Sequence, residues 1–246
     1  MYFYQPDTRR DEPVISALTE LAERYPRYGF KKLFQVIRRQ GHAWNHKRVH
    51  RIYCLLKLNF RRKVKQRLPV RNPAPLVTPQ ALNQSWSIHD ALVSGRRFLT
   101  FNVVDDFNRE ALAIEIDLNI SAQRVVRVLD RIVANRGYPL KMRMDNVPEL
   151  ISLALAEWAE SHGVILEFIR PGKPTENAFI ERFNRAYRTE VLDFYLFRTL
   201  NEAREITVRW LNEYNSELPH ESLNNLAPEE FRLMAEKQEI SKSSWN

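Results

Sequence analysis

The chain has 246 residues, of which 44% are hydrophobic and 28% charged, so it can form one large or two smaller domains around a hydrophobic core. It contains no run of about 18 apolar residues. Its first ten residues lack the apolar stretch of a secretory signal. The single cysteine, Cys54, excludes an internal disulfide and a Cys/His zinc motif. We therefore predict no membrane span and expect a protein of a reducing cytoplasm.

The net charge of +8 is unevenly distributed along the chain. Residues 1–73 carry 18 Lys and Arg against 5 Asp and Glu, whereas residues 74–246 carry 20 against 25. A strongly basic segment favours contacts with the phosphates of nucleic acid, which supply a salt-sensitive affinity independent of base sequence. A basic face that is simply solvated is the alternative.

The N-terminal residues predict three helices. Apolar spacing predicts helices over residues 13–24 and 28–39, and Gly41 ends the second. Asn45 is a plausible N-cap for a third helix over residues 46–56. A helix, a short turn and a basic helix form the helix-turn-helix layout, whose second helix enters the major groove. The predicted DNA-binding side chains in this region are Lys31, Lys32, Arg38, Arg39, Lys47, Arg48 and Arg51.

Residues 61–84 predict a linker. A basic run that ends at Arg67 is followed by Pro69, Pro73, Pro75 and Pro79, and Pro-rich segments are extended and semi-rigid. The basic half of this linker either follows a DNA backbone or keeps the linker soluble.

Strands and helices alternate in the remainder of the chain. The order is β-β-β-α-β-α-β-α, which is that of the ribonuclease-H-like fold, an α/β mixed sheet flanked by helices. The predicted strands are a short one at Trp86 and those over residues 98–104, 111–118, 140–144 and 164–169. The predicted helices run over residues 121–135, from Pro148 to about 162, from 177 to about 192, and over 201–214.

Two carboxylates lie in settings that point to a metal site. Asp145 follows a strand, and Glu181 lies on a helix, with 35 residues between the two. Ligands in open α/β sheets bind at the carboxyl ends of strands, and Mg²⁺ takes one or two carboxylates and keeps several waters. Considered singly, Asp145 also fits a capping or turn residue, and Glu181 a solvated helix carboxylate.

Residues 86–231 resemble the catalytic core of insertion-sequence transposases and retroviral integrases, the DDE recombinases. The chain is most similar to the second-frame (orfB type) product of a bacterial insertion-sequence family, and residues 24–60 resemble the small helical DNA-binding region that precedes such cores. The resemblance rests on Trp86-Ser87, Asn102-Val-Val-Asp-Asp-Phe107, Met144-Asp145-Asn146, Arg170-Pro-Gly-Lys-Pro-Thr175, Asn177-Ala-Phe-Ile-Glu181, and Tyr214-Asn215 with Pro219-His220.

This resemblance implies metal-dependent cleavage and strand transfer of DNA. Asp145 and Glu181 are then catalytic and bind Mg²⁺ or Mn²⁺, while Lys173 and Asn177 contact the DNA backbone; a plain loop surface is the alternative for these two. The implied division is a helical DNA-binding domain over residues 1–60, the linker, an integrase-like core over 85–235 and a tail over 236–246.

One departure from the family pattern affects the site directly. The pattern is Trp-Ser-x-Asp, with that Asp as the first metal ligand, but this chain reads Trp86-Ser87-Ile88-His89-Asp90. The ligand position holds His89, as if about three residues including the Asp had been deleted. Because strand side chains alternate between faces, Asp90 is a third catalytic and metal-binding candidate only if the strand slips by one residue.

Three further departures point in the same direction. Val147 replaces a Gly, which risks backbone strain beside Asp145. Glu176 replaces a Gln and Leu218 replaces an Arg, and both changes weaken attraction to phosphates. The chain therefore has the features of a decayed transposase.

Three functions remain open. The first is a transposase subunit with impaired catalysis, the second a catalytically dead DNA-binding remnant, and the third a nuclease that cuts RNA in hybrids, against which the helix-turn-helix region and the Gly172-Lys173-Pro174-Thr175 loop argue. The expected partners are double-stranded DNA, as element ends and target, the upstream-frame product or a fused version of it, and further copies of the chain on DNA. The implied location is the bacterial cytoplasm, at the nucleoid.

Overall fold

The computed structural model describes residues 8–59, 78–92, 98–145, 152–170 and 177–243, with the side chains of residues 8, 9, 90–92 and 239–243 outside this description. The chain divides into two compact units, Met1–Arg71 and Asn72–Asn246. Most of the predicted linker, together with Val147, Lys173 and Glu176, lies outside the described residues. The domain boundaries drawn from the sequence remain predictions.

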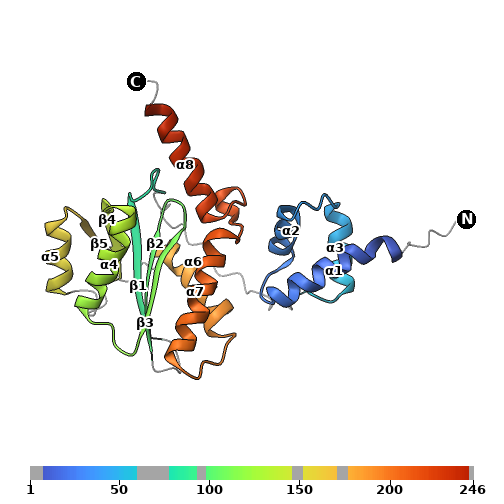
Figure 1. Ribbon diagram of the computed structural model, residues 1–246, viewed down its shortest axis with the longest axis horizontal. Coiled ribbons are helices and arrows are strands. Elements are labelled where there is room, and N and C mark those ends of the chain that lie inside the picture. The colour runs from blue at the N-terminus through green and yellow to red at the C-terminus, as the bar shows by residue number, and fades with distance from the viewer. Residues whose placement is uncertain (1–7, 60–77, 93–97, 146–151, 171–176, 244–246) are drawn as a thin grey trace, which may run out of the picture. The chain divides into compact units, whose positions relative to one another are not determined.

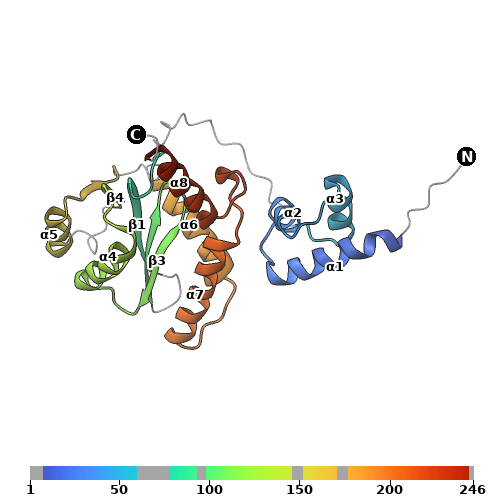
Figure 2. The same cartoon turned by 45° about the horizontal axis from the view of Figure 1, so that its top comes forward.

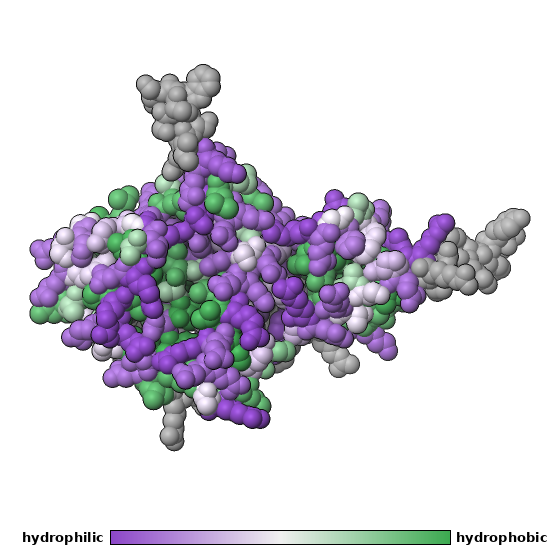
Figure 3. Space-filling view, in the orientation of Figure 1, coloured by the Kyte–Doolittle hydropathy of each residue, from purple (hydrophilic) through white to green (hydrophobic). Residues whose placement is uncertain are grey.

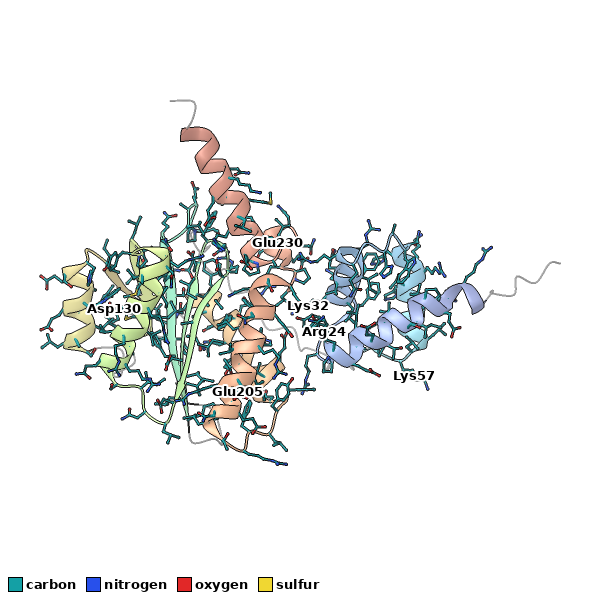
Figure 4. All side chains as sticks on the ribbon, in the orientation of Figure 1. Arg24, Lys32, Lys57, Asp130, Glu205 and Glu230 are labelled. Atoms are coloured by element: carbon teal, nitrogen blue, oxygen red, sulfur yellow. The ribbon has the colours of Figure 1, made fainter. Side chains whose placement is uncertain are left out.

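The helical unit contains three described helices (Figure 1). They are α1 (Thr8–Arg24), α2 (Phe30–Arg39) and α3 (His46–Leu55). The Asn45 side chain accepts a hydrogen bond of 2.8 Å from the backbone N–H of Lys47, so the predicted N-cap is confirmed. Leu18, Leu33 and Ile52 are buried between the helices. The side chain of Lys32, labelled in Figure 4, places Nζ 4.5 Å from the centre of the Tyr28 ring.

A charged clamp joins α1 to α3. Asp11 accepts hydrogen bonds from Arg48 Nε at 2.9 Å and from Arg51 Nη2 at 2.6 Å, and Arg48 also donates to the carbonyl of Arg10. The hydrogen bonds from Arg51 and Arg48 hold the pKa of the Asp11 carboxyl below its usual value. The two arginines are therefore part of the packing of this unit.

The core unit is built on a five-stranded mixed sheet in the order β3-β2-β1-β4-β5. Strands β1 (Ser85–Leu92), β2 (Leu99–Asp105) and β3 (Ala111–Asp117) form an antiparallel meander, and β4 (Lys141–Met144) and β5 (Ile165–Phe168) run parallel to β1. The chain order of strands and helices matches the prediction, so the ribonuclease-H-like fold class is confirmed.

Helices cover both faces of this sheet (Figures 1 and 2). On one face α4 (Ala122–Arg136) and α5 (Leu153–Ser161) cover a core around Trp86, Ile88 and Met142. Asp130 of α4, labelled in Figure 4, accepts a hydrogen bond of 2.7 Å from Trp158 Nε1 of α5. The opposite face is covered by α6 (Ala178–Tyr187), the π-helical turn η2 (Arg188–Leu192) and α7 (Leu200–Ser216). The chain ends in the short η3 (Glu221–Leu223) and α8 (Pro228–Ser243).

Two elements differ from the sequence prediction. Helix α5 begins at Leu153, where the Ser152 hydroxyl caps it by accepting a hydrogen bond from the Leu155 backbone N–H, and the predicted start at Pro148 lies outside the described residues. Helix α8 was not predicted, and it continues to Ser243 through residues where we expected a tail. Within the described ranges, no helix has the length and apolarity needed to cross a bilayer.

Two buried aspartates lie where β2 ends. Asp105 is fully buried and accepts hydrogen bonds from the backbone N–H groups of Asn83 at 2.9 Å and Phe107 at 2.8 Å. Burial nevertheless raises the pKa of Asp105 from 3.8 to about 6, since it penalises the charged form. Between those two values the folded chain binds more protons than the unfolded chain, so this carboxyl makes the fold less stable as the pH rises.

We predict that Asp105→Asn reverses this penalty. The unfolding free energy of the variant minus that of the native chain should be larger at pH 7 than at pH 4 by roughly 2–3 kcal/mol. Urea unfolding followed by tryptophan fluorescence at several pH values measures the difference. The same substitution at the exposed Asp193 controls for loss of a surface charge. A difference that stays constant from pH 4 to pH 7 would contradict the raised pKa.

Candidate active site

The position of each β1 side chain follows from strand pairing. The pairing of β1 with β2 runs without a break from Trp86–Asp105 to Leu92–Leu99, and β1 also pairs with β4 from Ser85–Lys141 to Ile88–Met144. Trp86 and Ile88 belong to the core under α4 and α5, so Ser87 and His89 lie on the opposite face. The backbone register assigns Asp90 to the face of Ile88 and contains no slip, while its side chain lies outside the described residues.

His89 lies at the position that the family pattern gives to its first carboxylate. Its Nδ1 is 3.2 Å from Asp145 Oδ2, and the Asn177 side-chain amide donates a hydrogen bond of 2.8 Å to Asp145 Oδ1. Both oxygens of Asp145 are therefore engaged. The hydrogen bond from His89 holds the pKa of Asp145 below its usual value, Asn177 adds to this effect, and partial burial opposes it.

Helix α6 lies across this face with one polar stripe. Asn177 at its N-terminus contacts Asp145, which directly follows β4, and Asn184 accepts a hydrogen bond of 2.7 Å from Asn102 Nδ2 of β2. Glu181 is four residues after Asn177 and three before Asn184, so the three share one side of the helix. β1 lies between β2 and β4 in the sheet. The turn of α6 that contains Glu181 therefore crosses β1, the strand of His89. The Glu181 side chain is exposed.

A buried polar network supports the strand ends from below. Asp106, fully buried, accepts hydrogen bonds from Ser85 Oγ at 2.8 Å, Ser87 Oγ at 2.5 Å and Arg143 Nη1 at 3.3 Å. Arg143 also donates to Glu167 of β5 at 2.9 Å. Burial raises the pKa of Asp106, and the hydrogen bonds of the two serines oppose that rise. On the same face of the sheet, Ser87 directly precedes His89 and Arg143 directly precedes Asp145. The network therefore holds the strand positions next to these two site residues in place.

The side chains around Asp145 carry oxygen atoms of the type that a divalent cation prefers. Asp145 and Glu181 supply the carboxylates that Mg²⁺ prefers, and the buried Asn177 Oδ1 and Asn102 Oδ1 make no hydrogen bond to any described residue. An imidazole such as that of His89 suits transition metals better than Mg²⁺. No three His, Cys, Asp or Glu side chains within the described ranges gather closely enough to hold a metal ion. The set is therefore smaller than the three-carboxylate site that the resemblance implies.

Sequence reasoning named part of this site and missed part of it. The structure brings Asp145 and Asn177 together, and it brings His89 into contact with them. Asn102 and Asn184 were missed, although a buried Asn inside an otherwise apolar strand was the available signal. Of the predicted DNA-binding side chains, Arg48 and Arg51 are bonded to Asp11.

A second concave surface lies away from these residues. A groove of about 580 Å³ runs along β3 between α4 and α7, and its apolar lining includes Leu112, Ile114, Val208 and Leu211. Figure 3 shows it as a hydrophobic patch on the visible face of the core. Charged groups around the groove are paired with one another, as in Arg131–Glu115 and Arg136–Glu110. The groove therefore lacks the converging polar groups of a reaction site.

Comparison with known proteins identifies the family. Two models described as integrase core domain match residues 80–174 and 162–228, and one described as HTH-like domain matches residues 9–66. A transposase assigned to insertion sequence element IS150 of Escherichia coli is 25% identical over 84% of this chain and 77% of its own length. The uncharacterized 31.7 kDa protein of insertion element IS407 from Burkholderia multivorans is 42% identical over 94% of this chain and 84% of its own. This chain belongs to the insertion-sequence transposases.

The transposase also resembles, in its fold, one chain of a viral intasome. A chain of the simian T-cell lymphotropic virus intasome, solved in complex with PP2A regulatory subunit B56 gamma, has a TM-score of 0.54 and 15% identity. The match covers 87% of this chain and 74% of the viral chain. At that identity the likeness establishes the shared fold alone.

We predict that His89→Ala raises the pKa of the Asp145 carboxyl in the transposase toward its ordinary value, because the variant loses the main hydrogen bond that lowers it. Carboxyl-carbon NMR titration of Asp145 measures the change. A lowered pKa adds stability at neutral pH that is lost as the pH falls through it, so the variant should also lose less stability in acid. His162→Ala, in another part of the core, is the matched control. An unchanged Asp145 pKa in His89→Ala would rule out the hydrogen bond.

Proposed function

We propose that this chain binds the double-stranded ends of its insertion sequence and retains a weakened site for cleaving and joining DNA strands. The helical unit supplies the DNA affinity, and Asp145 and Glu181 are the catalytic carboxylates. The observation that supports the proposal is the hydrogen bond from Asn177 to Asp145, which joins the start of the helix of Glu181 to the end of the strand before Asp145. The contact of His89 with Asp145 supports the weakening. Activity is therefore lower than in a transposase with three carboxylates.

Asp145 and Glu181 would hold Mg²⁺ or Mn²⁺. Such an ion, when bound, stabilises negative charge on the oxygens of a phosphodiester and lowers the pKa of the attacking group. The chemistry is phosphoryl transfer: a water first releases a 3′-hydroxyl at the element end, and that hydroxyl then attacks a phosphodiester of the target. The Asn177 amide orients Asp145, and Asn184 anchors the helix that carries Glu181.

His89 weakens this site in two ways. It removes one negative charge from the set that attracts a divalent ion, and its hydrogen bond competes for Asp145 Oδ2. A metal ion bound at Asp145 Oδ2 would share this oxygen with the hydrogen bond from His89. Asp90 helps only if its carboxylate reaches across to the face of Asp145, against the register of its strand.

The remaining functions and partners are ranked below this one. A dead DNA-binding remnant is the second candidate, favoured by the same His89 contact. A hybrid-cutting nuclease is the third, and a preference for RNA–DNA hybrid over duplex DNA would identify it.

We also propose that the chain works with an upstream-frame product and as an oligomer at the nucleoid, because transposition holds two element ends together.

We predict that His89→Asp increases strand cleavage and joining at least about tenfold, since a ligand of this kind is worth at least one to two orders of magnitude in metal affinity or activity. The assay uses the full chain and a labelled duplex carrying its element end, in Mg²⁺ and in Mn²⁺. Glu181→Gln should abolish products in both the native and the His89→Asp background.

Each outcome separates the candidates. Products from the native chain that vanish in Glu181→Gln indicate a working site in spite of His89. Products from His89→Asp alone identify a chain inactivated at this position. Absence of products from both, with DNA binding intact, contradicts the proposed activity and leaves the DNA-binding remnant.

DNA binding by the helical unit gives a separate prediction. Lys47 is exposed in the first turn of α3, and its ammonium group is a candidate partner for a DNA phosphate. Lys47→Gln should weaken binding to every duplex and reduce the slope of log affinity against log salt by about 1, because one phosphate contact is lost. Fluorescence anisotropy at four salt concentrations measures the slope. An unchanged slope would remove Lys47 from the interface.

A further inference from the structure

The two sides of α3 present different chemistry. On the side toward α1, Arg48 and Arg51 are bonded to Asp11, and the Asp11 side chain is only 11% exposed. If either arginine turned away to contact DNA, this carboxylate would lose a charged partner in a poorly hydrated position. Arg48 and Arg51, the arginines of the helix that could contact bases, are thus held by their ion pairs with Asp11.

The side toward α2 carries two ordered histidines. His46 and His50 are one turn apart and exposed, and their rings are parallel within 1° with centroids 6.3 Å apart. Phe30 packs edge-on against both, with centroid distances of 5.0 and 4.6 Å, and Phe34 packs against His46 at 5.0 Å. These contacts restrict the imidazole rotamers before any ligand arrives, which lowers the entropy cost of binding.

A second stacked pair lies in the turn before α3. The rings of His42 and Trp44 are 4.1 Å apart and parallel within 8°, and both side chains are partly exposed. Together with His46 and His50 they form what we call the imidazole face, which spans the turn and the first half of α3. In a helix-turn-helix, the turn and the N-terminal residues of the second helix are those nearest the base edges.

We propose that the imidazole face, and not Arg48 and Arg51, reads the base edges of duplex DNA in the major groove. This inference rests on the proposed DNA-binding function. Each imidazole offers a ring nitrogen as donor or acceptor to base edges. The surrounding segment is strongly basic, with 18 Lys and Arg against 5 Asp and Glu over residues 1–73, which favours a polyanion as the ligand.

The test compares two duplexes of equal length, one with the terminal repeat of the element and one of random sequence, bound to the full chain at one salt concentration. His46→Ala and His50→Ala should each weaken binding to the terminal repeat by about 5- to 150-fold, the range for a lost base contact. Binding to the random duplex should change less than about twofold. That retained affinity also shows that the helical unit is folded.

Two control variants sharpen the comparison. His162→Ala makes the same substitution at an exposed histidine stacked on Tyr138 in the other unit, and it should leave both affinities unchanged. Arg51→Gln opens the clamp to Asp11, so it should lower the melting temperature. Below that temperature it should keep the preference for the terminal repeat.

Three results would overturn the inference. If the native chain binds both duplexes equally, base reading and the proposed recognition of element ends both fail. If the native chain discriminates and both histidine variants discriminate equally well, the imidazole face is not the reader while the proposed function stands. If folded Arg51→Gln loses discrimination, the reading group is the arginine.

Discussion

Strand β1 is hydrogen-bonded on both sides, to β2 in antiparallel and to β4 in parallel register, and this double pairing governs the whole site. A central strand cannot shift by one residue without moving Trp86 and Ile88 out of the core, at a cost of several kcal/mol of lost burial. The register therefore brings His89 next to Asp145 and assigns the following residue to the other face. The chemistry available at the site follows from that single constraint.

The supporting network explains how a site with an altered ligand keeps its form. Asp106 is bonded to Ser85, Ser87 and Arg143, which precede His89 and Asp145 on the same face of the sheet, and none of these bonds involves His89. Asn177 and Asn184 hold α6 over the sheet from the opposite side. Because these bonds do not involve position 89, a substitution of His89 should leave the surrounding fold in place.

Charge in the helical unit is divided between packing and binding. Asp11 is one of only 5 acidic residues among the first 73, and it bonds two of the basic side chains of α3. A count of basic residues overstates the number available to DNA, because those near a buried carboxylate are structural. The aromatic contacts of Phe30 instead order imidazole rings on the exposed side of the same helix.

The sequence by itself determined the order of strands and helices, the Asn45 cap and the local settings of Asp145 and Glu181, because periodicity, capping and motif spacing are short-range properties. The cap of α5 at Ser152 and the helix beyond residue 236 were missed, since local signals there are weak and tertiary packing decides. Only the tertiary structure showed that Asp145 is bonded to His89 and Asn177, and that Arg48 and Arg51 belong to Asp11. Those partners lie 32 to 56 residues apart in the chain, and no local pattern encodes contacts at that distance.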